Sequence, residues 1–402
     1  LISKLSKEAI SEYFGSSYFA IYDLQGHLSM ISSILLNHEY FSNIVRDSNT
    51  YQLITNPTRI IMGKKGVLLM NIGTPDEATI PSVKKYLGEF LMDPDVIDIP
   101  AILRYILVKG IILNVRPKKI APRYASIWKE GDSPLRIYTN RMAEKLQSEL
   151  VNIECQVGMR YGNPSIAKGL KILKSKGVDE LVLAPLFPHH AQATTESSMK
   201  EAFRQLDKLR WRPDIFELGH FEDDPAFIGP LVESIRPHLQ DDSHLLFSFH
   251  GLPISQVKRS DKSGIHCQKI DGCCMISKDA NSMCYAHHCN MTVKAVVKEL
   301  GLLDDSWSIS YQSRFGPAKW LEPSTLSVVE DLAKRESNVV VVSPAFLVDG
   351  LETLEELNIE VREHYLKHGG QRFSVVECLN DRSSWIKGLS DLVKKSFRIK
   401  LY

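Results

Sequence analysis

The chain places a histidine where a buried strand is expected to end. The apolar run His244-Leu-Leu-Phe-Ser-Phe-His250 is followed by the turn residues Gly251 and Pro253. A run of this kind is typical of a parallel strand that leads into a loop at its carboxyl end. Ligands of open α/β sheets bind in the crevice outside these strand ends. His250 is therefore a candidate catalytic group or metal ligand, and the alternative is a histidine satisfied by turn hydrogen bonds.

A second candidate group is acidic. Four carboxylates follow one another at the spacing of one helix face: Asp349, Glu352, Glu356 and Glu360. Between them runs an apolar stripe that would face the core: Leu351, Leu354, Leu357 and Val361. Carboxylates in one row repel each other, which favours a site for protons or cations. The alternative is structural, because Asp349 and Glu352 have the spacing of a capping box and the other two would form a solvated face.

Cysteine forms the third group. Five of the seven cysteines share one short window: Cys267, Cys273, Cys274, Cys284 and Cys289. Cys155 and Cys378 lie elsewhere in the chain. In a reducing compartment such a cluster favours metal binding over disulfides.

Composition limits the classes of protein to consider. Hydrophobic residues make up 44% and charged residues 24% of the 402 residues, and the net charge is +1. These values are typical of a soluble globular protein and give no field that would attract nucleic acid. The longest apolar stretch, residues 99–115, is interrupted by Arg104 and Lys109. We therefore expect that it can lie on a membrane but cannot cross one. Without a signal-peptide pattern, we expect a cytoplasmic location, with peripheral contact at the inner membrane as an addition.

An internal repeat organises the elements that carry these residues. Four pairs of segments match in order: 70–75 with 247–253, 159–164 with 312–317, 181–187 with 338–347, and 214–223 with 372–381. The repeat predicts an α/β fold of two similar doubly wound parallel-sheet domains with a cleft between them. The expected parts are an extension over 1–61, a first domain over 62–236 and a second over 237–402. No G-x-G-x-x-G follows the first strand, which argues against a dinucleotide site.

Four motifs of the chain resemble those of ferrochelatase, the enzyme that inserts ferrous iron into a porphyrin. They are Asn71-Ile-Gly-Thr-Pro75, Ser248-Phe-His-Gly-Leu-Pro253, Tyr311-Gln-Ser-Arg-Phe-Gly316 and Leu351-Glu-Thr-Leu-Glu-Glu-Leu357. The similarity runs in one order from about Lys65 to Val393. It implies the two-domain chelatase fold with the active site in the cleft.

The resemblance assigns roles to individual residues. His250 would be the base or first metal contact and Glu352 the essential glutamate, with Asp349, Glu356 and Glu360 as a relay. The residues implied in porphyrin binding are Asn71, Arg160, Tyr161, Gln312 and Ser313. Relatives often carry a histidine or cysteine two residues before the glutamate, where this chain has Gly350, so no second imidazole is expected there. His189 and His190 end the equivalent strand of the first half and are weaker candidates.

The stretch 86–128 resembles the lip over the family's active site. It is rich in Leu, Ile and Val, and its basic residues are Arg116, Lys118, Lys119 and Arg123. Its alternative is a core helix pair with solvated basic ends.

The cysteine window, about 264–290, resembles an insertion that holds a [2Fe–2S] cluster in some bacterial ferrochelatases. Four thiolates are the usual ligands, here Cys267, Cys284 and Cys289 with one of Cys273 or Cys274. A structural zinc site is the alternative, with nitrogen ligands available from His266, His287 and His288. Unligated thiols are a third possibility.

The resemblance implies a lyase of haem biosynthesis. The expected reaction is protoporphyrin IX plus Fe²⁺ to protohaem, with release of two protons, as the last step of the pathway. The alternatives are iron insertion into coproporphyrin III and a tetrapyrrole-binding protein without chelatase activity.

Overall fold

The computed structural model describes residues 20–22, 28–30, 63–276, 279–314, 316–335 and 338–398. The chain divides into two compact units, Leu1–Met62 and Gly63–Tyr402. In the first unit, β1 (Ala20–Tyr22) pairs with β2 (Leu28–Met30) in antiparallel fashion. The remainder of the expected extension, and with it any test of that expectation, lies outside the described residues.

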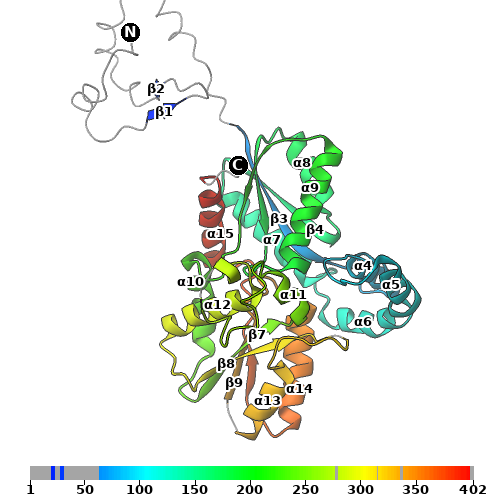
Figure 1. Cartoon of the computed structure of the whole chain (residues 1–402), viewed down its shortest axis with the longest axis vertical. Helices are drawn as coiled ribbons and strands as arrows, with labels where there is room; N and C mark the ends of the chain where they lie inside the picture. Colours follow the sequence, from blue (N-terminus) through cyan, green and yellow to red (C-terminus); the bar gives the residue numbers. More distant parts are fainter. Residues whose placement is uncertain are drawn as a thin grey trace, which may run out of the picture. The chain divides into compact units, whose positions relative to one another are not determined.

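Two four-stranded parallel sheets form the centre of the second unit (Figure 1). The first contains β3 (Lys65–Thr74), β4 (Ile153–Gly162), β5 (Glu180–Pro185) and β6 (Asp214–Glu217) in the order β4-β3-β5-β6. The second contains β7 (Ser243–His250), β8 (Trp307–Gln312), β9 (Asn338–Val342) and β10 (Phe373–Val375) in the order β10-β9-β7-β8. Counted from the first strand of each half, the two orders are identical. The predicted repeat of two doubly wound sheets is confirmed.

Helices connect the strands of the first half. They are α4 (Ile80–Leu91), α5 (Ala101–Tyr105), the π-helix η3 (Ile106–Ile112), α6 (Leu113–Ile127), α7 (Pro134–Glu149), α8 (Ile166–Ser175), the π-helix η4 (Gln192–Glu196), α9 (Ser197–Leu209), α10 (Pro225–Ile235) and the 3₁₀ turn η5 (Arg236–His238). Side-chain caps start several of them: Thr79, Ser165 and Asp224 accept backbone N–H groups in the first turns of α4, α8 and α10. Such caps satisfy N–H groups that have no partner within the helix.

The second half follows the same plan with an addition after its first strand. Its helices are α11 (Ile254–Arg259), the 3₁₀ turn η6 (Asp279–Asn281), α12 (Tyr285–Leu300), α13 (Thr325–Lys334), the π-helix η7 (Glu352–Val361), α14 (Arg362–Lys367) and α15 (Ser383–Ser396). The cysteine window lies between α11 and α12 and ends within α12.

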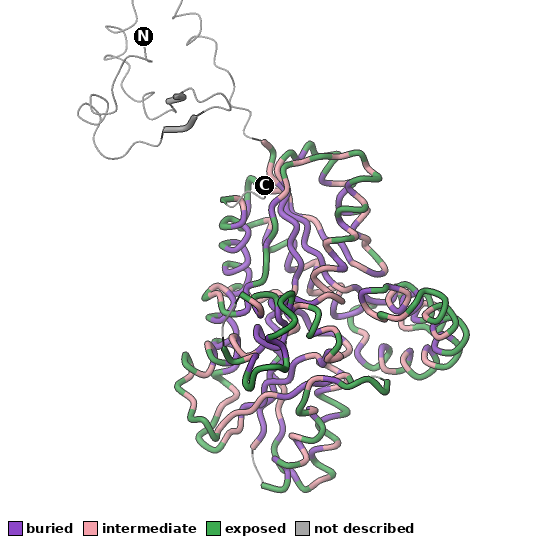
Figure 2. The backbone as a smooth tube through the Cα atoms, in the orientation of Figure 1, coloured by how far each residue is buried: buried purple, intermediate pink, exposed green. Residues whose placement is uncertain are grey.

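Strand β3 shows why the sheets are buried on both faces (Figure 2). Leu68 and Met70 pack with leucines of α8 and α9, while Val67 and Leu69 pack on the opposite face with Met142 of α7. Side chains alternate between faces along a strand, so a sheet covered by helices on both sides needs a continuous apolar run. The apolar runs of the sequence match this requirement.

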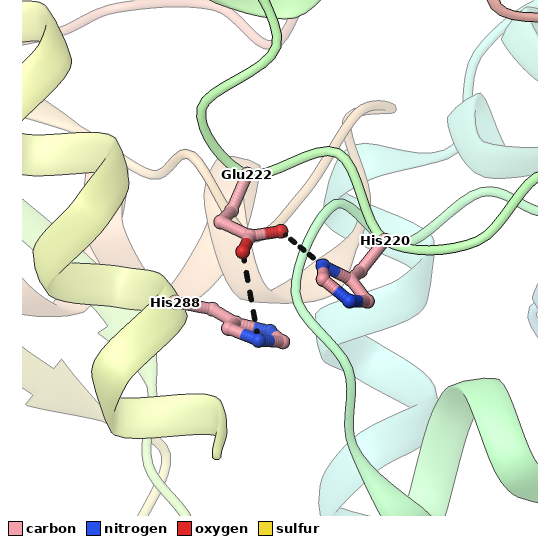
Figure 3. A group of neighbouring side chains, drawn as sticks. All are labelled: His220, Glu222 and His288. Atoms are coloured by element: carbon pink, nitrogen blue, oxygen red, sulfur yellow. Dashed lines mark hydrogen bonds and ion pairs between the residues drawn. The ribbon is translucent and has the colours of Figure 1, made fainter. Parts of the chain in front are cut away.

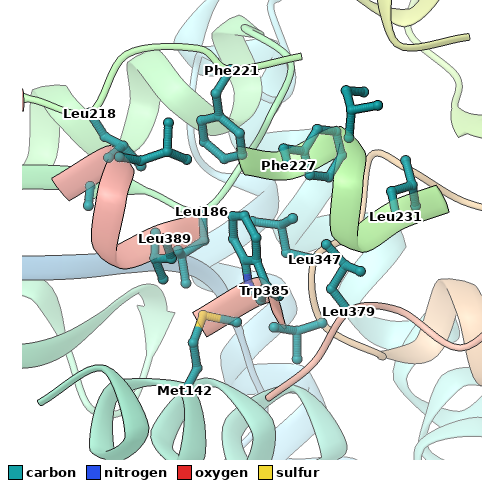
Figure 4. Packing of buried hydrophobic residues seen from close by; sticks show 14 of the residues in the cluster. Met142, Leu186, Leu218, Phe221, Phe227, Leu231, Leu347, Leu379, Trp385 and Leu389 are labelled. Carbon is teal, nitrogen blue, oxygen red and sulfur yellow. The ribbon is translucent and has the colours of Figure 1, made fainter. Parts of the chain in front are cut away.

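Trp385 of α15 joins several elements in one core (Figure 4). Its ring is fully buried against Phe221 and Phe227, with centroid distances of 6.0 and 6.1 Å. The same cluster contains Leu186, which follows β5, and Leu347, which follows β9. Helix α15 comes last in the chain but packs beside α7 and α10 of the first half.

Helices α4 to α6 form a lobe beside the sheets (Figure 1). Val108 and Ile112 face its interior with Tyr86 and Tyr124. The outer side of the lobe presents large apolar side chains to solvent, including Ile102, which is 76% exposed, and Ile106, which is 56% exposed. Within the described residues, no helix combines the length and hydropathy that a membrane span requires.

Candidate active site

His250 lies at the carboxyl end of β7, opposite Gln312 of β8. Its imidazole is half-buried, and Nδ1 lies 2.6 Å from the carbonyl oxygen of Gly251. Because a carbonyl oxygen can only accept, Nδ1 carries the proton in this contact and the lone pair is on Nε2. The turn hydrogen bond therefore uses Nδ1 and leaves Nε2 available to act as a base or to contact a metal.

Gln312 connects this strand end to the glutamate helix. Its Nε2 donates to the backbone carbonyl of Glu352 at 3.0 Å, and its Oε1 accepts from Ser248 Oγ at 2.8 Å. Gln312 is buried. Its amide, predicted to bind substrate, is thus held between protein partners and fixes the first residue of η7 beside the end of β7.

Glu352 is half-buried at the start of η7. Burial raises the pKa of its carboxyl, the charge of nearby His250 lowers it, and Glu356 raises it. Tyr86 of α4 and Tyr124 of α6 lie near Glu352. Burial raises the pKa of both phenols, and the charge of Glu352 raises both further. The end of the second sheet, the π-helix and the lobe of α4 to α6 therefore meet around Glu352.

The acidic row continues outward from Glu352. Glu356 accepts the backbone N–H of Ser313 at 2.7 Å and its hydroxyl at 2.5 Å. Ser313 adopts a left-handed conformation, with φ of 62°, that directs both groups to the carboxylate. Glu360, whose side chain is 47% exposed, lies 2.8 Å from Arg123 Nη1. The row thus runs from a half-buried carboxyl to solvent.

The helix type was not foreseen. The sequence predicts α-helical spacing, whereas residues 352–361 form a π-helix, in which residues five apart are close. Glu355 and Glu360 are five residues apart, and Arg123 Nη1 contacts both of them, at 3.1 Å and 2.8 Å. Arg123 belongs to α6, so it ties the lobe to the acidic helix.

Asp349 lies apart from the row. Its carboxylate is buried and accepts from Thr353 Oγ1 at 2.8 Å and Asn380 Nδ2 at 2.6 Å. The π-helix begins after this residue, so Asp349 anchors the loop before η7 to the loop before α15.

Arg160 and Tyr161, both predicted to contact the porphyrin, are held by the carboxylate of Asp93, which was not among the predicted site residues. Asp93 is buried and accepts from Arg160, from Tyr161 OH at 2.7 Å and from Ser197 Oγ at 2.6 Å. The pattern Asp93-Pro94-Asp95 after a helix was the available signal. Asn71 is also buried and donates to Thr139 Oγ1 at 3.0 Å.

His189 and His190 contact the cysteine insertion. His189 Nε2 lies 2.8 Å from Thr292 Oγ1, and the ring meets Tyr285 edge-on at 5.9 Å. Burial lowers the pKa of His189 to about 3. The backbone N–H of His190 donates to His288 Nδ1 at 3.1 Å. Both histidines therefore contribute to the seam between the first half and α12.

A buried glutamate completes this seam (Figure 3). Glu222 lies 2.7 Å from His220 Nδ1 and 3.5 Å from His288 Nε2, and the two rings stack at 4.5 Å. Three such ligand atoms could hold a metal ion. Both nitrogens of His288 are already engaged, however, because Nε2 also lies 2.8 Å from the Ser282 carbonyl. This network joins two parts of the fold, and no pattern in the sequence indicates it.

The five cysteines of the insertion are free thiols, and all of them except Cys274 are buried. Cys273 Sγ and Cys274 Sγ are 3.7 Å apart, and Cys284 occupies the N-cap position of α12. A hydrogen bond from Cys274 lowers the pKa of Cys284, and backbone N–H groups of α12 assist while burial opposes. Burial raises the pKa of Cys267 and of Cys289. Four buried thiols, one of them with a lowered pKa, have the chemistry that an iron–sulfur cluster requires. Among the described residues, no three of these thiols lie within 4.8 Å of one another.

The three histidines of the window have other partners. His266 Nε2 lies 3.1 Å from the Cys273 carbonyl, His287 Nδ1 lies 2.9 Å from the Cys274 carbonyl, and His288 contacts Ser282 as described. They hold the backbone of the loop, which favours an all-thiolate ligand set over a mixed zinc site. Tyr285, between two cysteines, donates its hydroxyl to the carbonyl of His250 at 2.9 Å. The insertion therefore touches the strand end that carries the candidate base.

Comparison with known proteins gives a consistent result. A family model described as Ferrochelatase matches residues 64–397. A protein named ferrochelatase from Bdellovibrio bacteriovorus is 42% identical over 337 residues, which are 83% of this chain and 99% of the relative. One from Stutzerimonas stutzeri is 39% identical over 338 residues, with the same coverage. Among solved structures, SirB from Bacillus subtilis matches 83% of this chain and 95% of its own with 11% identity and a TM-score of 0.46, too low to add to the argument.

Proposed function

The chain belongs to the ferrochelatase family, a family of metal chelatases whose substrates are a porphyrin and Fe²⁺, and we propose that its porphyrin is protoporphyrin IX. The reaction would give protohaem and two protons, as the last step of haem biosynthesis. The observation that carries the insertion step, which is common to either porphyrin, is the pairing of His250 with Glu352. Nε2 of His250 has no hydrogen-bond partner among the described residues, and Glu352 lies near enough for a charge on His250 to lower its pKa.

The chemistry explains why these groups are needed together. Iron enters the macrocycle only as the two pyrrole N–H protons leave, so the site needs a base near the ring centre and an exit for protons. His250 Nε2 would accept a pyrrole proton. Burial raises the pKa of Glu352, so this carboxyl is suited to take up a proton and pass it on.

The exit would follow the acidic row. Glu356 stands next, held by Ser313, and Glu360 stands at the solvent end beside Arg123. The same negative row would attract Fe²⁺ toward the site. Asp349 is not included, because its carboxylate is already bonded to Thr353 and Asn380.

The macrocycle would lie between the lobe of α4 to α6 and the strand ends of the second sheet. Tyr86, Tyr124 and Leu351 belong to one apolar cluster there. Bending the ring to expose its nitrogens would cost about 1–5 kcal/mol, drawn from contacts along the ring. Because Arg160 is held by Asp93 and Ser197, another cation is needed for the propionates, and exposed Arg314, beside Gln312 in a cavity of about 400 Å³, is available.

The competing substrate is coproporphyrin III, which carries more propionates. Anaerobic turnover of the purified chain with each porphyrin and Fe²⁺, followed by product analysis, separates the two. A higher kcat/KM with protoporphyrin IX supports the proposal, and a clear preference for coproporphyrin III overturns it. Absence of product from either porphyrin would leave a tetrapyrrole-binding protein.

We also propose that the insertion holds a [2Fe–2S] cluster through Cys267, Cys284, Cys289 and one of Cys273 or Cys274. Such a cluster would cross-link the loop and supply a one-electron couple. Cys284→Ser should abolish the visible absorption and the bound iron and sulfide, whereas only one of Cys273→Ser and Cys274→Ser should do so. A colourless wild-type protein that contains zinc would contradict this assignment.

The exposed apolar side of the lobe supports a peripheral membrane contact in a cytoplasmic setting. Apolar side chains on a surface helix partition into the headgroup boundary without crossing the bilayer. An Ile102→Ser, Ile106→Ser variant should float with phosphatidylglycerol vesicles less than the wild type. Val151→Ser, at a position that is 82% exposed but outside the lobe, is the matched control and should behave as the wild type.

A further inference from the structure

A second group of metal-binding side chains lies between α13 and α14, and the proposed reaction uses none of them. His364 belongs to α14, His368 caps its carboxyl end, and Glu330 belongs to α13. One ligand atom of each lies within 4.8 Å of the other two. Histidines four residues apart on a helix face the same side, which allows both to bind one ion.

The distances suit a single ion. Nε2 of His364 and Nε2 of His368 each lie 3.9 Å from the same atom, Oε2 of Glu330. At that length neither contact is a hydrogen bond. Two ligand atoms that are each about 2.1 Å from one ion can be at most about 4.2 Å apart, so both histidine–glutamate separations already fall within reach of a shared ion.

The ring protons also favour a metal. His368 Nδ1 lies 2.8 Å from the carbonyl oxygen of His364, so Nδ1 carries the proton and the Nε2 lone pair is free. A hydrogen bond from the other ring nitrogen to a backbone carbonyl is the usual way a protein orients a metal-ligating histidine.

His364 supplies an independent indication. Its Nε2 is shielded from solvent and has no hydrogen-bond partner among the described residues. A buried polar atom without a partner is unfavourable and calls for an explanation. An ion between the two imidazoles and the carboxylate would provide the missing partner.

Glu330 is held so that one oxygen remains for an ion. Lys334 Nζ binds Oε1 at 2.9 Å, and Oε2 is the atom that faces the imidazoles. Asp331, on the same helix, lies 3.6 Å from Lys334 and adds negative charge nearby.

From this geometry we propose that Glu330, His364 and His368 form a site for a divalent transition-metal ion, of which Zn²⁺ is the type. Two imidazoles and one carboxylate suit zinc, copper, nickel and ferrous ions better than Mg²⁺ or Ca²⁺. The three side chains are half-buried, so water would complete the coordination. Helix α14 continues directly from η7, so a bound ion would clamp the far end of the helix that begins with Glu352.

Equilibrium dialysis of the full chain against Zn²⁺, with metal counted by mass spectrometry, tests the site. His364→Gln, His368→Gln and Glu330→Gln should each bind one Zn²⁺ fewer per chain than the wild type. His238→Gln, which changes a histidine of η5, should bind the same number as the wild type. Other zinc-binding positions, including the cysteines, are unchanged in all four variants and cancel in the comparison.

A second readout identifies the ligands. Cu²⁺ bound to the wild type should show electron spin-echo modulation from two imidazoles at this site, and His368→Gln should remove it while circular dichroism shows the variant folded. Equal zinc stoichiometry in the wild type, His364→Gln and His368→Gln would overturn the proposal. These measurements do not involve porphyrin, so they succeed or fail independently of the proposed function.

Discussion

The hydrogen bonds from Ser313 to Glu356 give the most specific prediction about the acidic row. Ser313→Ala removes the hydroxyl that donates at 2.5 Å and keeps the backbone N–H that donates at 2.7 Å. A hydrogen bond to a charged group is worth about 1.5–3 kcal/mol. Because one of the two donors remains, we expect a loss near the lower limit, which corresponds to about a tenfold fall in kcat.

The backbone of Ser313 allows a sharper design. Its φ of 62° lies in the left-handed region, which glycine adopts without steric cost. Ser313→Gly also loses the hydroxyl but relieves this strain, so it should match Ser313→Ala in kcat and exceed it in stability. Ser306→Ala removes a hydroxyl that donates to the Leu303 carbonyl and is the control for serine loss.

The assay is anaerobic haem formation, with kcat and KM determined for the wild type and the three variants, and thermal denaturation for folding. If Glu356 acts in proton transfer, kcat should fall while KM stays close to that of the wild type. A folded Ser313→Ala variant whose kcat is within twofold of the wild type would refute it.

Three further predictions concern the same site and the core. Burial raises the pKa of Glu352, so ionisation of this carboxyl makes the folded state less stable. Glu352→Gln should therefore abolish turnover yet stabilise the fold. In thermal melts this gain in stability should be absent below about pH 4, where a glutamate of the unfolded chain is protonated, and should grow as the pH rises. Burial raises the pKa of Glu355 and Arg123 lowers it, so Arg123→Met should raise this pKa further in an NMR titration of the Glu355 carboxyl; an unchanged pKa would mean that Arg123 does not stabilise this carboxylate. Trp385→Ala should cost about 3–5 kcal/mol of unfolding free energy in denaturant titrations, and Trp385→Phe should cost less; equal losses would mean that ring packing is not the source.

The parts of the fold that were predictable are those fixed by local pattern. Continuous apolar runs indicated strands buried on both faces, and the matching order of the segments in the two halves indicated the repeat. The position of His250 followed from the same rule, since parallel strands end at one edge of a sheet. The cysteine window was recognisable by spacing alone.

Partners distant in the chain were not predictable. Arg160 was expected in the porphyrin site, but Asp93, 67 residues earlier, holds its guanidinium. Asp349 was expected in the acidic row, but Asn380, 31 residues later, bonds its carboxylate. Charge and spacing identify groups that need a partner, and only the packing of elements decides which partner they find.

The π-helix is the other feature that spacing did not indicate. Residues four apart lie on one side of either helix type, so the row of Glu352, Glu356 and Glu360 gave no means to choose between them. The bridge from Arg123 to residues five apart distinguishes the two, and it depends on α6, which is distant in sequence.

The most direct test of the central claim is the rate of haem formation from protoporphyrin IX and Fe²⁺, without oxygen, by the wild type and by His250→Ala. We expect that the wild type forms haem and that the variant, folded by circular dichroism, loses nearly all turnover because no base remains at the end of β7. A His250→Ala rate equal to that of the wild type would contradict it.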